Sequence, residues 1–214
     1  MPYKYGYLFR GPIRRSLSVN RRIQSQLAKC VEDIPASNQL ALLGSILTED
    51  NDVIITSFKG GYLVPALNQL RHAQEVSNKI FAFHVSPQLR DKPKVHPTTA
   101  SQEFSRKGLK GWGEKYTILS QITHVNRDFL VNIYPSLRQS IPTSENMENL
   151  ITYHICTLNV LCSRALFVLV KETEANGTNV SDKRQRQIDS IDDQVMELME
   201  SAYESVKSVK ENSR

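Results

Sequence analysis

The stretch Thr143–Lys171, TSENMENLITYHICTLNVLCSRALFVLVK, decides the fold of this chain. Apolar residues recur along it in alternating steps of four and three, the spacing of one face of an α-helix. They are Ile151, Ile155, Leu158, Cys162, Ala165 and Leu169. The adjoining face carries Met147, Leu150, His154, Leu161 and Val168. Because a helix that is apolar nearly all round must be surrounded by protein, the stretch predicts a central helix at about 144–172.

We expect this helix to lie in a soluble core and not in a membrane. Its apolar part, from Ile155 to Val170, is shorter than the roughly 20 residues that span a bilayer, and it contains Asn159 and Arg164. The N-terminus lacks the apolar segment of a secretory signal. The three cysteines lack metal-ligand spacing, as is typical of a reduced intracellular protein. These features predict a soluble intracellular protein, cytoplasmic in preference to nuclear, without a membrane partner.

Further helices are predicted on both sides of the central one. Amphipathic patterns run from Ser18 to Ile34 and from Ser37 to the acidic turn at 49–52. A long charged helix is expected at about 182–210. Its apolar stripe has heptad spacing and comprises Ile188, Ile191, Val195, Leu198 and Ala202. Such a stripe packs against a bundle or forms a subunit interface, and we expect a homo-oligomer assembled through this helix.

A small βαβ insert is predicted at 53–86. Val53–Phe58 is a short run rich in β-branched residues, Pro65–Val76 has the pattern of a helix with proline in its first turn, and Ile80–Val85 is a second apolar run. The expected fold is therefore mainly α: a bundle in one domain, 18–214, which contains the insert and a basic loop at 87–115 and follows an N-terminal arm at 1–17.

The N-terminal segment is basic and aromatic. Residues 1–22 contain no acidic side chain. Their basic and selected aromatic residues are Lys4, Tyr5, Tyr7, Arg10, Arg14, Arg15, Arg21 and Arg22. Cations attract phosphates and flat rings stack on exposed bases, so this composition is typical of single-stranded nucleic-acid binding. The alternative is a segment whose tyrosines pack on the protein while its arginines are solvated.

The loop at 87–115 has a similar composition. Its candidate nucleic-acid contacts are Lys92, Lys94, Lys107, Lys110 and Trp112. A loop of this length inside a domain is often a binding element. The alternative, which the burial habits of tryptophan favour, is a linker whose Trp112 packs against the bundle.

The sequence Lys59-Gly60-Gly61 follows the first predicted strand, where backbone amides and a helix N-terminus can hold a phosphate. It resembles the first strand and loop of PP-loop nucleotide-binding proteins, whose pattern is Ser-Gly-Gly-x-Asp-Ser. Lys59, Leu63 and Val64 stand where that pattern has serine, aspartate and serine. The resemblance implies a nucleotide site, whereas a glycine pair needed only for a tight turn explains the same residues and is favoured.

Catalytic and metal-binding patterns are not found. The five histidines are not spaced as metal ligands, and no serine has the sequence context of a nucleophile elbow. We therefore expect neither a cofactor nor a metal, and a non-enzymatic protein that binds RNA or single-stranded nucleic acid. The alternatives are a nucleotide-binding enzyme or regulator that uses Lys59, Gly60 and Gly61, and a scaffolding subunit that assembles through its C-terminal helix.

Overall fold

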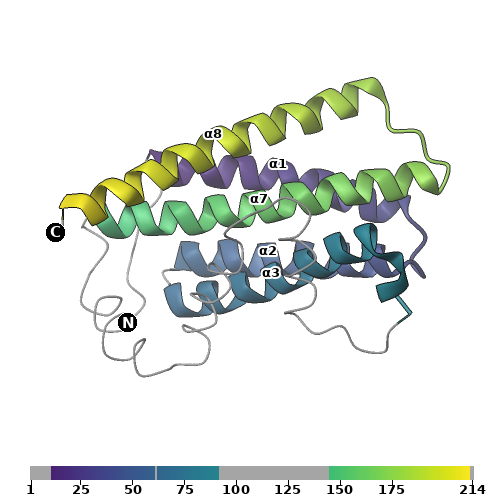
Figure 1. Cartoon of the computed structure of the whole chain (residues 1–214), viewed down its shortest axis with the longest axis horizontal. Helices are drawn as coiled ribbons and strands as arrows, with labels where there is room; N and C mark the ends of the chain where they lie inside the picture. The colour runs from purple at the N-terminus through teal and green to yellow at the C-terminus, as the bar shows by residue number, and fades with distance from the viewer. Residues whose placement is uncertain (1–10, 61, 92–144, 213–214) are drawn as a thin grey trace.

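The computed structural model describes residues 11–60, 62–91 and 145–212, and this part of the chain forms a bundle of long α-helices (Figure 1). The helices are α1 (Pro12–Asp33), α2 (Gln39–Gly60), α3 (Leu63–Val85), α7 (Glu145–Ala175) and α8 (Asp182–Asn212), and a short 3₁₀ turn, η1 (Pro87–Leu89), follows α3. Helix α7 packs against α1, α2, α3 and α8. In Figure 1 α8 lies above α7 and the α2–α3 hairpin lies below it, while α1 packs against α7, α2 and α8.

The central position of α7 confirms the prediction made from its periodicity. Every residue of the predicted first stripe is buried, and so are His154, Leu161 and Val168 of the second. Asn159 is buried as well, whereas Phe167 is 51% exposed. By length and composition the segment Ile151–Ala175 could also cross a membrane, yet 83% of its most apolar window is buried inside the bundle. Burial by neighbouring helices is what characterises the core helix of a bundle.

Helix α8 covers α7 and α1 with the predicted stripe. Ile188, Ile191, Val195 and Ala202 are buried, and Leu198 is partly buried against the core. The tight turn before it uses Gly177, whose φ of 86° lies in the left-handed region. Because the stripe is already covered within the chain, self-association through α8 would use other residues of that helix, and it stays a prediction.

The predicted βαβ insert is wrong, because the structure describes helices where both strands were expected. Val53–Phe58 continues α2, and Ile80–Val85 is the last part of α3. Within α2, Ile54, Ile55 and Phe58 extend the buried side that begins at Leu40. A short apolar β-branched run suits a strand or a buried helix equally, and packing against α3 and α1 decides for the helix.

Two helix boundaries also differ from the prediction. Helix α1 begins at Pro12, so residues 12–17 of the predicted arm form its first turns, and Ile13 and Leu17 are buried there. Helix α2 does not end at the acidic turn but passes through it to Gly60. Its close contact with the bundle depends on Gly44, where a Cβ would lie 2.8 Å from Val31 Cγ2 and 2.9 Å from Leu169 Cδ1.

Candidate anion-binding pocket

The first half of α1 presents a basic face beside its buried side. Arg14, Leu17, Ser18 and Arg21 are spaced i, i+3, i+4 and i+7, which places them on one side of the helix. Leu17 is 6% exposed and anchors that side to the core, while both arginines are exposed. The first turn of α1 carries no acidic residue and no side-chain cap, so the positive end of the helix dipole has no counter-charge there.

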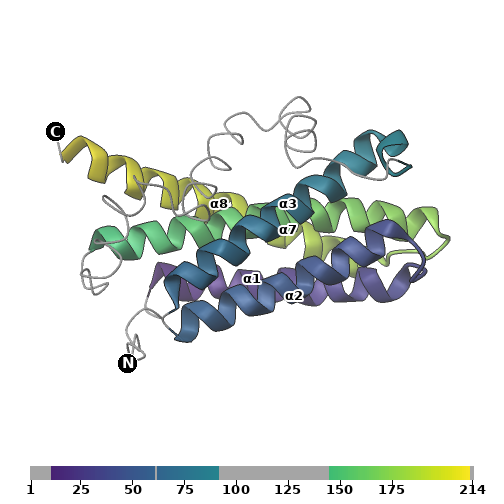
Figure 2. The ribbon, with the colours of Figure 1, turned by 90° about the horizontal axis from the view of Figure 1, so that it is seen from below.

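Lys59 comes to the same place from α2. It is exposed in the last turn of α2, which runs antiparallel to α1 and reaches the end of the bundle where α1 begins (Figure 2). A lysine in a last turn complements the negative end of its own helix. The buried Phe58 and the bond from the Tyr62 amide to the Ser57 carbonyl, 2.8 Å long, hold this helix end in position.

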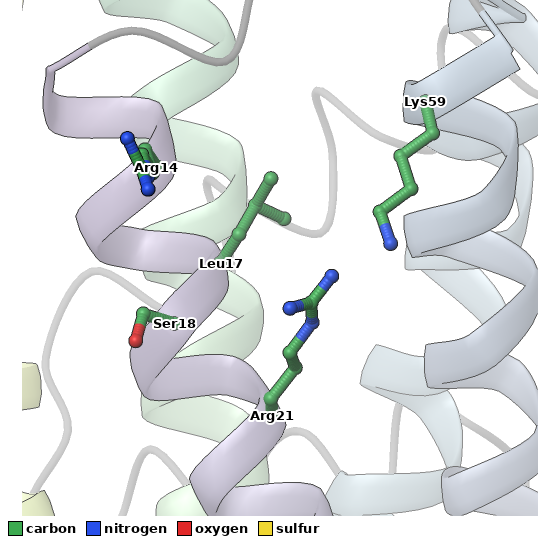
Figure 3. Close-up of a pocket in the computed structure, with 5 residues that line it drawn as sticks. All are labelled: Arg14, Leu17, Ser18, Arg21 and Lys59. Atoms are coloured by element: carbon green, nitrogen blue, oxygen red, sulfur yellow. The ribbon is translucent and has the colours of Figure 1, made fainter.

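Together these residues line a pocket between α1 and α2. Its volume is about 400 Å³, and its lining consists of Arg14, Leu17, Ser18, Arg21 and Lys59. The side chains of Arg21 and Lys59 extend toward each other from the two helices, and Leu17 projects from α1 on the same side as Arg21 (Figure 3). The Ser18 hydroxyl points away from Lys59. The pocket therefore combines three cations with one apolar side chain, Leu17, and none of its described lining residues carries a carboxylate.

The cations of this pocket are not neutralised by other described residues. Elsewhere in the described chain, arginines form ion pairs: Arg71 with Glu75, Arg90 with Glu172, Arg164 with Asp192 and Arg184 with Asp33. Arg14, Arg21 and Lys59 form no ion pair or hydrogen bond with a described carboxylate. Like charges that converge without a counter-charge repel each other, and a bound anion relieves that repulsion.

The structure thus separates the predicted nucleic-acid contacts into groups. Arg14 and Arg21 join Lys59 in the pocket, which unites residues of two separate sequence hypotheses. Arg22 instead faces α8 and donates to Gln194 Oε1 at 2.7 Å, and Arg15 is exposed outside the pocket lining. The remaining candidates, Lys4, Tyr5, Tyr7, Arg10, Lys92, Lys94, Lys107, Lys110 and Trp112, lie outside the described residues.

The loop context that the PP-loop resemblance implied is absent from the described residues. Gly60 is the last residue of α2, and Val53–Phe58 before it is helical. A Cβ at Gly60 would lie 2.8 Å from two ring carbons of Tyr62, so this glycine allows a close ring contact. Gly61 lies outside the described residues. Lys59 remains a phosphate-binding candidate because of the pocket, and not because of a strand followed by a glycine loop.

Sequence reasoning missed a layer of polar side chains in the core. Asn20 of α1 donates through Nδ2 to Asn51 Oδ1 of α2 and to Asn159 Oδ1 of α7, both at 2.9 Å. Asn159 Nδ2 donates to the Ser16 carbonyl, also at 2.9 Å. All three asparagines are at most 1% exposed. The sequence contained one sign of this layer, because Asn159 is a polar residue in an otherwise apolar stretch. Its partners lie on other helices, so the local sequence did not identify them.

A second polar contact joins α2 to α3. Asp50 is 4% exposed, and its Oδ2 lies 2.7 Å from His72 Nδ1, while Gln69 donates to Oδ1. Burial raises the pKa of Asp50 above its ordinary value, because desolvation of the carboxylate outweighs the attraction of His72.

The raised pKa of Asp50 predicts a specific pH dependence. Because the folded chain holds the proton of Asp50 more tightly than the unfolded chain does, protonation of Asp50 favours the fold. This contribution to the free energy of unfolding is fully present below the ordinary pKa of aspartate, about 3.9. It is lost as the pH rises through the raised pKa of Asp50 in the folded chain. Asp50→Asn removes the charge, and its stability relative to the native chain should increase with pH across this interval. Urea denaturation at a series of pH values measures this, with the exposed Asp52→Asn as control. A native chain that loses stability relative to Asp50→Asn on acidification would contradict it.

The described residues offer little for thiol or metal chemistry. Cys30, Cys156 and Cys162 are buried and free, and burial raises the pKa of each thiol, which keeps it protonated and unreactive. Residues 11–60, 62–91 and 145–212 contain no group of three or more His, Cys, Asp or Glu side chains that could hold a metal ion.

The pocket between α1 and α2 is therefore the strongest candidate site in the described chain. Its chemistry is that of an anion receptor. Comparisons with protein-family models, curated proteins and solved structures find no match to this chain.

Proposed function

We propose that this protein is a non-enzymatic binder of RNA or single-stranded nucleic acid and that it holds the phosphate backbone in the pocket between α1 and α2. The observation that carries the proposal is that Arg14, Arg21 and Lys59 line one pocket without a described acidic partner. Release of counterions from phosphates by such cations drives nucleic-acid binding.

The length of the basic face favours a chain of phosphates over a single ion. Arg14 and Arg21 are two helical turns apart, about 10 Å along the axis, and Lys59 faces them from α2. The nucleotide-binding alternative uses the same Lys59, but the helical position of Gly60 removes the loop geometry that supported it.

The dependence of affinity on salt tests the proposal. Each phosphate contact on a single strand contributes about 0.7 to the slope of log affinity against log salt. We expect the variant Arg14→Ser/Arg21→Ser/Lys59→Ser to bind an unstructured RNA oligonucleotide with a slope reduced by about two. Fluorescence anisotropy over a range of salt concentrations measures this slope.

The matched control removes the same net charge elsewhere. Lys29→Ser/Lys183→Ser/Arg186→Ser changes three exposed basic residues that do not line the pocket. The control should keep the native slope. Equal slope losses in both variants would show binding by net charge alone, and failure of the native chain to bind RNA would refute the function.

A further inference from the structure

The strongest additional feature is an exposed aromatic residue that follows closely after Lys59 of the pocket in the sequence. Tyr62 lies between α2 and α3, three residues after Lys59, and is 55% exposed. Sequence reasoning assigned stacking to Tyr5, Tyr7 and Trp112 and did not consider this tyrosine. Single-stranded nucleic-acid binding combines cations that hold the phosphates with exposed rings on which bases stack, and Tyr62 is an exposed ring three residues from one of the pocket's cations.

The backbone holds Tyr62 firmly at this turn. Its amide donates to the Ser57 carbonyl at 2.8 Å, and its carbonyl accepts from the Ala66 amide at 3.0 Å. The chain leaving α2 and the first turn of α3 are thus both bonded to this residue. A ring on a fixed backbone loses less conformational entropy when it binds a ligand than a ring on a free loop.

Gly60 determines where the ring lies. A Cβ on Gly60 would be 2.8 Å from both Cδ2 and Cε2 of Tyr62, closer than real Cβ contacts allow. One edge of the ring therefore lies against Gly60 at the end of α2, in space that a side chain at residue 60 would occupy. The helical backbone of Gly60 gives no conformational reason for glycine, so the ring contact is the structural demand on this position.

We infer that Tyr62 is a nucleobase-stacking residue, seated by Gly60, that binds one base of a single strand whose phosphates occupy the pocket of Arg14, Arg21 and Lys59. This inference rests on the proposed function. The inference adds to the proposed function by assigning the contact with a base to the α2–α3 turn. Stacking accepts every base, so the inferred ligand class is single-stranded nucleic acid of any sequence, in preference to polyanions that lack bases.

The test separates base contact from phosphate contact. Tyr62→Ala should weaken binding of an oligoadenylate by about 5- to 150-fold, the range found when a stacking aromatic residue is truncated, and should leave the salt slope unchanged. Its affinity for inorganic polyphosphate, which has no bases, should stay as in the native chain. Tyr62→Trp should retain the native affinity for oligoadenylate. The matched control is Tyr203→Ala on α8, where the tyrosine is 54% exposed.

Gly60→Ala provides a second variant, whose effect cannot come from loss of the ring. Alanine favours a helix over glycine, so the thermal stability should not fall, whereas the new Cβ should displace Tyr62 and weaken oligoadenylate binding. Equal losses with Tyr62→Ala and Tyr203→Ala, or equal losses for oligoadenylate and polyphosphate, would overturn the stacking role. A pocket variant that loses salt dependence while Tyr62→Ala binds normally would leave the proposed function standing and refute this inference alone.

Discussion

Leu166→Ala is expected to lower the free energy of unfolding by about 2–5 kcal/mol, the usual cost of truncating a fully buried leucine. Leu166 is 0% exposed in α7, the helix that contacts α1, α2, α3 and α8. The variant loses the free energy gained by burying the removed methyl groups, and a cavity remains because the closely packed neighbours do not fill the space. Urea denaturation followed by circular dichroism measures the change.

The adjacent Phe167 is the control for this prediction. It is 51% exposed and contributes a cation–π contact with Lys171, whose Nζ lies 5.9 Å from the ring centre. Phe167→Ala should cost less than about 1 kcal/mol, because little area is lost and alanine favours a helix. The reverse order of the two effects would mean that α7 is rotated about its axis relative to the described packing.

Asn159→Ala is expected to lower the free energy of unfolding by about 2–4 kcal/mol. The substitution removes the acceptor for Asn20 Nδ2 and the donor to the Ser16 carbonyl. Asn20 Nδ2 keeps its bond to Asn51 and the Ser16 carbonyl keeps its bond within α1, but each loses one buried hydrogen bond, and such a loss costs about 1–3 kcal/mol. This effect is large for a small side chain because the site is buried, with Asn159 1% exposed.

A double-mutant cycle with Asn20→Ala shows whether the asparagines act as one unit. Once Asn20 is removed, Asn159 has already lost a partner, so the two losses should not add, and the coupling energy should be about 0.5–3 kcal/mol. Asn179→Ala, in the exposed α7–α8 turn, should change stability by less than about 0.5 kcal/mol. Strictly additive losses would contradict a shared network.

The sequence predicted the long helices because their periodicity extends over many turns. In α7 and α8 the apolar residues recur often enough to exclude a strand; the first predicted stripe of α7 is buried, and so is the stripe of α8 apart from the partly buried Leu198. The same reasoning failed for Val53–Phe58 and Ile80–Val85. A run of six mostly apolar or β-branched residues shows no distinctive period, so its secondary structure depends on neighbours that the local sequence does not contain.

The candidate site shows the same division between sequence and tertiary structure. The sequence alone identified Arg14, Arg21 and Lys59 as cations able to bind phosphate, because charge is a property of the residue. It did not place them together, since the arginines and the lysine belonged to two competing hypotheses. Only the antiparallel packing of α1 on α2 brings them around one pocket. Tyr62 and the buried asparagines were missed for the same reason: exposure, and the hydrogen bonds between helices, exist only once the helices pack against one another.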